Sequence, residues 1–511
     1  MIDWTALVVF LILFGGVTVL GFAAANWRRG DLNVLHEWGL AGRRFGTLIT
    51  WFLLGGDVYT AYTFVALPAL ATGLGALAFF PLTLITAVCY PLVFVFGPRF
   101  WAIAHKRHYI TYADFARDRY DSKGLELIVA VTSIIAVMLY ISLQLVGLQV
   151  AIKALGLTGT GWAGDVPVIV AFAILAAYTY RGGLRAPALV AIVKDILIYV
   201  TAIAAVIYIP LQLGGFANIF AAAERTLSAL PKPASTVLAP AQYTAFVTLG
   251  IGSGLALFMY PNNITAVLSA KSTDVVRRNM AMLPAYTLML GLIALSGYMA
   301  LAAGLHLSSP NDAIPMLYQH FFPSWFFGMT MAAIGIGALV PAAVMSIAAA
   351  NLYTRNIHMA LGARTLTERE ETNVAKTASL VVKLGALAAV LFLPAQYSIY
   401  YQLFAGALIL QIVPTVLIGL YTRWFHRVAL VAGWIAGIAV ALWMIIANHF
   451  ASVFTLHFFG APVTMFIGIW ALAADLLVAA VATIALDAAR TSRGIDRTTT
   501  EDYVEVEYPA N

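Results

Sequence analysis

The sequence predicts an all-α membrane protein that crosses the bilayer thirteen times. Of its 511 residues, 62% are hydrophobic and 10% are charged, whereas soluble proteins average about 45–50% apolar and about 25% charged residues. The apolar residues gather into runs of about 20, the length that crosses the hydrocarbon core. A soluble enzyme and a large domain outside the membrane are therefore excluded, because too few polar residues exist to cover their surfaces.

Thirteen such runs follow one another, with boundaries good to about four residues. They are Trp4–Ala25, Thr47–Ala71, Ala76–Gly97, Leu125–Val150, Val166–Tyr180, Pro187–Leu213, Ala241–Leu268, Met280–Leu305, Trp325–Leu352, Thr377–Pro394, Tyr397–Leu420, Val428–Asn448 and Val463–Ala488. The longest outer loop, Gly214–Pro240, contains an amphipathic stretch around Ile219–Leu230. The polar tail, Thr491–Asn511, is predicted to be disordered.

The basic residues indicate the orientation of the chain. Of 29 Lys and Arg residues, 24 fall in alternate loops or the tail, and only Lys153, Arg225 and Lys232 fall in the opposite loops. Because Lys and Arg accumulate on the cytoplasmic side, we expect the N-terminus outside and the C-terminus in the cytoplasm. The net charge of +6 then reflects topology, not a nucleic-acid surface.

Two spans contain interruptions that suit a lipid-facing helix poorly. The second span holds Gly55, Gly56 and Asp57 followed by several hydroxyls, and the seventh holds a glycine-rich run before Tyr260 and Pro261. Unwound backbone is tolerated inside a membrane where it lines a cavity, so paired interruptions mark a transport site. Close packing of helices is the alternative for the glycines. It does not explain Asp57, because a buried charge costs about 2.5–3.5 kcal/mol.

The two interruptions lie five spans apart, which predicts inverted five-helix repeats over spans 2–6 and 7–11. The chain then divides into a peripheral first helix, the two repeats, two further peripheral helices and a cytoplasmic tail. These parts cover residues 1–26, 47–213, 241–422, 427–490 and 491–511.

Six short stretches resemble the sodium:solute symporter family. They are Glu37–Arg44, Thr111–Phe115, Tyr180–Ala186, Leu268–Ser272, Tyr353–Ile357, and Pro414 with Gly419–Trp424. The resemblance implies a LeuT-like fold of thirteen helices. Within the family, Trp51–Asp57 and Gly183–Ala188 resemble the bacterial monocarboxylate permease branch, which carries lactate, pyruvate, propionate and similar acids.

The resemblance also bears on the coupling ion. In sodium-coupled members, one site joins two carbonyls of the broken first core helix to two hydroxyls of the eighth core helix. Here the carbonyls are expected near Gly56 and Tyr59. The positions on the eighth core helix fall on Gly337, Val340 and Pro341, whose side chains offer no oxygen, so we expect a degenerate sodium site.

Lys194, beside Asp195 in the sixth span, is the first candidate for coupling. In a LeuT-like fold this span passes close to the sodium position, where an ammonium could replace the ion. A snorkelling lysine or a structural Lys–Asp pair is the alternative. Asp57 is the rival carrier, because ionisable groups inside the membrane are functional by default. Lys383 is expected to pair locally, and Asp475 is interpreted as structural.

The candidate substrate contacts gather around the two interruptions and on the third core helix. They are Trp51, Gly55, Gly56, Asp57, Tyr59, Tyr62, Thr63, Gln144 and Tyr260. Aromatic residues also serve ordinary packing, and each remains open to that interpretation. An unpaired amide in lipid is costly, so Gln144 is expected to face protein or the cavity.

These observations predict a secondary active symporter for small monocarboxylates in the cytoplasmic membrane of a bacterium, coupled to protons. A sodium symporter of another small solute, such as an amino acid, is the alternative, and a channel or sensor module is a weaker one. The sequence shows no nucleotide loop, nucleophile elbow or metal-binding helix motif, so neither an enzyme nor a cofactor is predicted. The expected partners are the substrate and the bilayer, without nucleic acid or an obligate protein.

Overall fold

The computed structural model describes residues 2–27, 30–157, 162–362, 366–392 and 400–504. Arg28, Arg29 and Arg364, which contribute to the predicted charge asymmetry, lie outside these residues, as does the predicted boundary at Pro394 and Tyr397. Within the described residues, twelve helices are long and apolar enough to cross a membrane. The remaining predicted span is discontinuous, because Thr47–Gly56 and Tyr62–Leu74 are each too short to cross alone.

The elements of the first half run from the N-terminus to the outer loop after the sixth span. They are α1 (Trp4–Ala23), η1 (Ala24–Asn26), α2 (Leu35–Leu40), η2 (Ala41–Arg43), α3 (Thr47–Gly56), η3 (Tyr62–Ala66), α4 (Leu67–Leu74), α5 (Ala76–Phe79), η4 (Leu84–Cys89), α6 (Tyr90–Lys106), α7 (Tyr112–Tyr120), α8 (Lys123–Ala154), α9 (Trp162–Gly182), α10 (Arg185–Gln212) and α11 (Phe216–Ser228).

The second half repeats the pattern and adds two peripheral helices. Its elements are η5 (Pro240–Gln242), α12 (Tyr243–Met259), α13 (Pro261–Ser269), α14 (Thr273–Met282), α15 (Pro284–Ala294), α16 (Ser296–Ala302), η6 (Pro310–Asp312), α17 (Ala313–Phe321), α18 (Ser324–Leu352), η7 (Tyr353–His358), α19 (Met359–Leu361), α20 (Glu368–Phe392), α21 (Tyr401–Ile409), η9 (Leu410–Ile412), η10 (Pro414–Ile418), α22 (Arg427–Ala447), β1 (Val453–Phe458), β2 (Ala461–Phe466), α23 (Ile467–Ala488) and η11 (Thr500–Tyr503).

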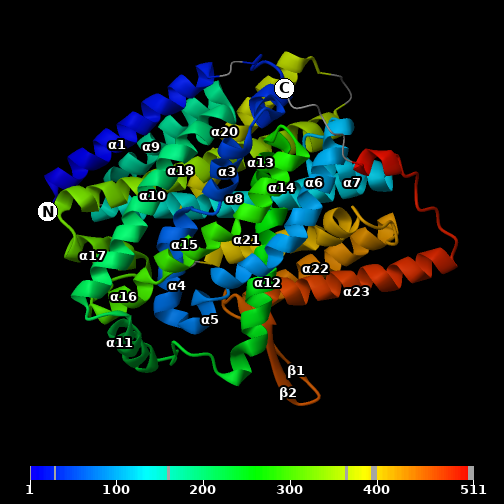
Figure 1. Ribbon diagram of the computed structural model, residues 1–511. Helices are drawn as coiled ribbons and strands as arrows, with labels where there is room; N and C mark the ends of the chain where they lie inside the picture. The colour runs from blue at the N-terminus through cyan, green and yellow to red at the C-terminus, as the bar shows by residue number, and fades with distance from the viewer. Residues whose placement is uncertain (1, 28–29, 158–161, 363–365, 393–399, 505–511) are drawn as a thin grey trace.

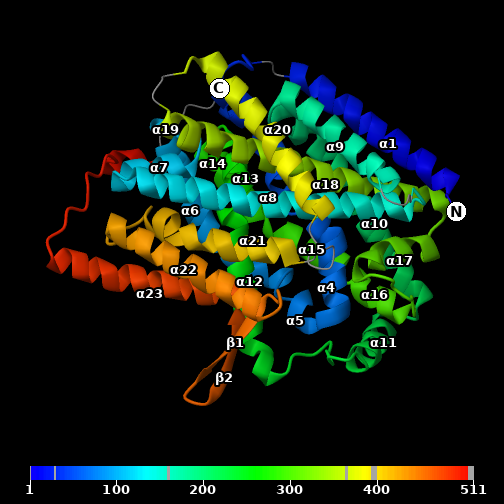
Figure 2. The same ribbon diagram turned by 180° about the vertical axis from the view of Figure 1, so that it is seen from behind.

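The long helices α8 and α18 pack against each other through the middle of the bundle (Figure 1). Helix α1 covers α18 from outside, and α22 and α23 form a pair at one edge (Figure 2). The most hydrophobic window of α18 is buried throughout. The core therefore surrounds α18, whereas the peripheral helices expose much of their surface, as expected of faces that contact lipid.

The third predicted span, Ala76–Gly97, is not a single helix. Gly75 has a φ of +58°, α5 lasts one turn, and the chain resumes as regular helix only at Tyr90, with Pro91 in the first turn. Proline suits the start of a helix because it lacks an N–H group. Helix α6 then continues to Lys106, so Arg99 and Lys106 lie on that helix and not in the predicted loop.

A short antiparallel hairpin of β1 and β2 precedes the last helix and projects from the bundle (Figure 1). Its register pairs Val453 with Phe466 and Phe458 with Ala461. The apolar run from Val463 was predicted to be helical throughout, but its first residues belong to β2 and α23 begins at Ile467. Apolar β-branched residues suit a strand as well as a buried helix, and composition alone does not separate the two.

The tail is ordered through Val504, so the prediction of a disordered tail is wrong for residues 491–504. Asp502 pairs with Arg107 at 2.6 Å and Asp496 pairs with Arg119 at 2.6 Å. Burial opposes ionisation of Asp502, but hydrogen bonds from Arg107 and Thr499 hold the pKa of that carboxyl below its usual value. The tail reaches η11 beside α6 and α7 (Figure 2), because Arg107 at the end of α6 and Arg119 on α7 attract its acidic side chains.

Candidate functional site

The first interruption separates α3 from η3. The chain turns at 57–60 before helical structure resumes, and two threonines hold the turn. The Thr63 hydroxyl donates to the Val58 carbonyl at 2.8 Å and accepts the Thr60 N–H at 3.2 Å, while the Thr60 hydroxyl accepts the Tyr62 N–H at 3.0 Å. Threonine hydroxyls that bond the backbone in this way compete with helix formation. Thr63 therefore supports the break, and it is not among the described lining residues of the cavity between the two interruptions.

Gln144 stabilises the same interruption from α8. Its side-chain oxygen accepts the Ala61 N–H at 2.9 Å, and the amide is fully buried. This N–H opens the helix that follows the break, where no backbone carbonyl is available to receive it. The structure thus places Gln144 as a cap on the broken helix.

The second interruption is a single extended residue. Tyr260, with φ −63° and ψ 136°, separates α12 from α13, and Pro261 begins the new helix. The Tyr260 hydroxyl donates to the Gln402 carbonyl at 2.9 Å. The two interruptions meet where Asn262 donates to the Asp57 carboxylate at 3.2 Å. The other carboxylate oxygen of Asp57 is buried without a described hydrogen-bond partner.

Lys194 lies against the carbonyl end of the first break. Its ammonium, fully buried, donates to the Gly56 carbonyl and to the Tyr59 carbonyl, the latter at 2.9 Å. It also lies 3.2 Å from a carboxylate oxygen of Asp195. One ammonium therefore has three oxygen neighbours, two of which are the carbonyls that the family resemblance assigned to an ion.

Aromatic side chains pack together beside Asp195, the carboxylate neighbour of this ammonium. The Tyr286 hydroxyl lies 3.1 Å from the Asp195 carboxylate, and the ring centroids of Trp51 and Tyr59 each lie 4.6 Å from that of Tyr286. A Cβ on Gly55 would lie 1.8 Å from the Tyr286 ring, so only glycine permits this approach. Trp51, Gly55 and Tyr59 thus pack against Tyr286, and among them Tyr59 also contacts Lys194 through its carbonyl.

The degenerate positions of the eighth core helix lie inside α18. Val340 and Pro341 are buried there, and a Cβ on Gly337 would contact Ile198 on α10 at 3.8 Å. Ser346, the nearest hydroxyl along α18, accepts a hydrogen bond from Ser379 at 3.2 Å, and Ser379 in turn accepts one from Lys383 at 2.8 Å. Ser346 therefore belongs to the surroundings of the second buried lysine, Lys383, which pairs locally.

A small cavity lies between the two interruptions. Its volume is about 30 Å³, and its lining residues are Val58, Tyr62, Leu82, Tyr90, Tyr140, Ser253, Leu257, Thr287, Leu290 and Gln402. Four polar atoms in this lining are buried without a described hydrogen-bond partner. They are the hydroxyls of Tyr62, Tyr90 and Ser253 and the side-chain oxygen of Gln402. Such groups are costly unless a ligand or water satisfies them. The cavity therefore offers three hydroxyl donors beside an aliphatic wall, and none of its described lining residues is charged.

Among the predicted substrate contacts, Tyr62 lines this cavity, whereas Asp57 and Tyr260 lie in the interruptions beside it. Sequence reasoning missed Tyr90 and Gln402, because each lies in an ordinary helical stretch that carries no signal. Ser253 falls in the glycine-rich run of the seventh span, and that pattern was the available signal for it. Asn262 directly follows Tyr260 and Pro261, so the same break was the signal from which it could have been predicted.

A bundle of membrane-crossing helices with two interruptions beside a small cavity is the architecture of a membrane transporter. The model of the sodium:solute symporter family matches residues 38–437, and the chain belongs to that family. A solved structure of a Na⁺-coupled sialic acid symporter has a TM-score of 0.75 at 14% identity and covers 94% of this chain and 98% of that one. The predicted LeuT-like fold is confirmed.

Two relatives of known name are similar to this chain over different shares of its length. Over 488 residues the chain is 49% identical to the monocarboxylate transport permease protein of Rhizobium johnstonii, covering 95% of this chain and 98% of the relative. Over 286 residues it is 24% identical to the sodium/pantothenate symporter of Escherichia coli, covering 54% and 55% of the two chains. The family and these relatives are transporters, which accords with the absence of enzyme motifs in the sequence.

Proposed function

We propose that this transporter imports small monocarboxylates such as lactate, pyruvate or propionate by alternating access, with protons as the coupling ion. The observation that carries the substrate class is the cavity between the interruptions. Hydroxyls of Tyr62, Tyr90 and Ser253 are donors for a carboxylate, and Val58 with Leu257 offers an apolar wall for a short chain. The name of the Rhizobium johnstonii relative agrees with this substrate class.

The proposed coupling residue is Lys194. Its contacts with the carbonyls of Gly56 and Tyr59 occupy the position where the family resemblance implies sodium. Transfer of the Lys194 proton to the cytoplasm removes the charge that holds these carbonyls, which frees the first break to move. Asp195, 3.2 Å away, stabilises the charged form while the ammonium is in place.

The charge balance favours a proton as the partner of an anionic substrate. Moving an anion inward against the membrane potential costs about 2.3 kcal/mol per 100 mV. One proton carried with the substrate cancels this charge, so the pH gradient alone drives accumulation. The distribution of basic residues supports a bacterial cytoplasmic membrane location with the N-terminus outside.

Uptake by the purified protein in liposomes tests both parts of the proposal. Labelled lactate, pyruvate and alanine are offered under a proton gradient or a sodium gradient imposed separately. We expect accumulation of lactate and pyruvate under the proton gradient. No accumulation of any monocarboxylate under either gradient would overturn the substrate class.

Lys194→Ala then tests the coupling. The variant should lose gradient-driven accumulation while exchanging labelled for unlabelled substrate across the membrane. Lys383→Ala, which changes the other buried lysine of the spans, is the matched control and should accumulate substrate. Accumulation by Lys194→Ala under the proton gradient would refute the role of this lysine.

Sodium coupling is the second candidate, favoured by unpaired oxygens at the interruptions. Oxygens of Asp57 and Asn262 are buried there without described hydrogen-bond partners, and carbonyl and carboxylate oxygens are the ligands that hard cations prefer. Strict dependence on sodium at fixed pH, with Lys194→Ala still active, would select this candidate.

A further inference from the structure

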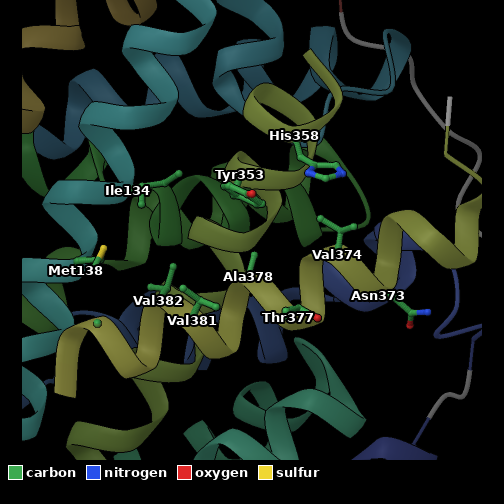
Figure 3. Close-up of a pocket in the computed structure, with 11 residues that line it drawn as sticks. Ile134, Met138, Tyr353, His358, Asn373, Val374, Thr377, Ala378, Val381 and Val382 are labelled. Atoms are coloured by element: carbon green, nitrogen blue, oxygen red, sulfur yellow. The ribbon is translucent and has the colours of Figure 1, made fainter. Parts of the chain in front are cut away.

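Two places outside the transport site differ in the polar atoms that they bury. The first is a groove between α8, η7 and α20, lined mainly by apolar side chains such as Met138, Ala378 and Val382 (Figure 3). None of its described lining residues has a buried polar side-chain atom without a hydrogen-bond partner, so this lining requires no ligand. The second place, where η9 meets α22 and α23, contains three such atoms.

The three atoms belong to Asp475 on α23 and Gln411 in η9. Each of these residues is 1% exposed. Both carboxylate oxygens of Asp475 and the side-chain oxygen of Gln411 are buried without a described hydrogen-bond partner. The Gln411 side-chain nitrogen donates to the Ala407 carbonyl at 2.8 Å, so this amide has its donor engaged and its acceptor unpaired. The place therefore holds acceptor oxygens that lack a donor.

Two glycines of α22 bring the carboxylate and the amide to one place. Gly433 and Gly437 lie one turn apart on the same face of the helix, in the spacing that permits close approach between membrane helices. A Cβ on Gly433 would overlap the Asp475 carboxylate. A Cβ on Gly437 would overlap the Gln411 side-chain oxygen and lie 3.0 Å from the Asp475 Cβ. Both polar groups therefore lie against the same face of α22.

No basic side chain on the helices that meet here balances the Asp475 carboxylate within the described structure. Arg427, the only charged residue of α22, lies at its first position and pairs with Asp121 at 4.0 Å. On α23, the other charged residue is Asp487, which pairs with Arg493. Helix α21 and η9 contain no charged residue. Because buried charges in proteins are either paired or bound to metal ions, the carboxylate requires a cation from outside the chain or a proton.

We propose that Asp475 and Gln411 bind a monovalent metal cation such as sodium. Carboxylate and amide oxygens are ligands that hard cations prefer. One such ion satisfies all three acceptor oxygens and balances the single negative charge, whereas a divalent ion would leave a positive charge within the membrane. A proton on Asp475 removes the charge but leaves the Gln411 oxygen unpaired, because no hydrogen bond joins the two side chains.

The position of the ion defines its role. Helices α22 and α23 lie after the second five-helix repeat, and Gln411 belongs to the last span of that repeat. The ion therefore holds the two peripheral helices to the repeat and stabilises the fold, and it takes no part in moving the substrate. The proposal depends neither on the transported substrate nor on the coupling ion.

Thermal unfolding of the purified transporter in detergent tests the site, with sodium chloride compared with choline chloride at the same concentration and pH. We expect an unfolding temperature about 2 °C or more higher in sodium, the shift for an ion present at about ten times its dissociation constant. Asp475→Asn should lose this difference between the salts. It should remain folded without the ion, because the new amide supplies a donor and removes the charge. Gln411→Leu should reduce the difference.

Asp57→Asn is the matched control, because it changes a buried carboxylate at the interruptions and leaves Asp475 in place. It should retain the difference between the two salts, and size-exclusion chromatography reports the folding of every variant. Loss of the difference in Asp57→Asn would place the ion at the interruptions and overturn the proposal. A difference retained by Asp475→Asn would overturn it as well. Equal unfolding temperatures of the unchanged chain in the two salts would show that Asp475 holds only a proton. Since uptake is not measured here, failure of this site and failure of the proposed coupling are told apart.

Discussion

The two interrupted helices have the same place in their repeats but are held in different ways. The first break is tied to its neighbours by Gln144 on α8 and Lys194 on α10, in addition to its own threonines. The second has one extended residue, Tyr260, a proline after it, one hydroxyl bond to α21 and a local hydrogen bond from the Asn263 side chain to the Leu257 carbonyl. The first break therefore depends on groups that can gain or lose bonds, whereas the second is fixed mainly by local geometry.

This difference indicates that the two breaks have different roles in transport. A break whose carbonyls are held by an ammonium changes its stability when the proton is lost, so it is suited to coupling. A break fixed by proline and backbone geometry has no such dependence and is suited to shaping the cavity. The hydrogen bond from Asn262 to Asp57 joins the two, so a change in one reaches the other directly.

The largest expected effect tests the contrast between the two buried lysines. Lys194→Met leaves the Asp195 carboxylate and two backbone carbonyls without their partner, which should cost about 3–5 kcal/mol of stability. Lys383 donates to a single described group, the Ser379 hydroxyl, and Lys383→Met should leave stability nearly unchanged. Thermal unfolding in detergent measures the stability of both purified variants. Equal losses of stability would show that the contacts of Lys194 contribute no more than those of Lys383.

The link between the breaks is tested by Asp57→Asn. The substituted amide still pairs with Asn262, so the fold should persist, but the charge is lost. Since hydrogen bonds to charged groups are worth about 1.5–3 kcal/mol, we expect uptake to fall about tenfold or more. Asp475→Asn, at a carboxyl buried on α23, is the control and should transport normally. Wild-type uptake by Asp57→Asn would remove this carboxylate from the mechanism.

The cap on the first break has a smaller expected effect. Gln144→Met keeps the side-chain volume but leaves the Ala61 N–H buried and unpaired, a loss of about 1–3 kcal/mol. Gln149→Met, at a half-buried position on the same helix, should unfold at the temperature of the unchanged chain. If the two variants unfolded together, the first break would be held by Lys194 and its own threonines without a contribution from Gln144.

The sequence predicted the positions of both breaks, because glycine, threonine and proline act on the backbone within a few residues of themselves. The nearness of Lys194 to Gly56 and Tyr59 followed from the family resemblance, since spacing along the chain does not bring α10 to α3. Tyr90 and Gln402 were missed for the same reason. Their side chains meet at the cavity only after distant helices have packed.

The role of Gln144 and the order of the tail also lay beyond the sequence. An amide on a buried helix face predicts a polar partner but not which one, and the Ala61 N–H becomes available only after the helix breaks. The tail is polar enough to be disordered in isolation. It becomes ordered because Arg107 and Arg119 lie on elements that the fold brings beneath its acidic residues.

The smallest expected effect is at the second break. Tyr260→Phe removes one hydrogen bond to the Gln402 carbonyl, worth about 0.5–1.5 kcal/mol, while Pro261 and the extended backbone remain. Uptake should therefore persist with a slightly lower unfolding temperature. Tyr298→Phe, where the buried hydroxyl has no described hydrogen-bond partner, should show no loss and serves as the control. Uptake abolished by Tyr260→Phe would show that transport depends on the bond between the second break and α21, and the division between a coupling break and a shaping break would fail.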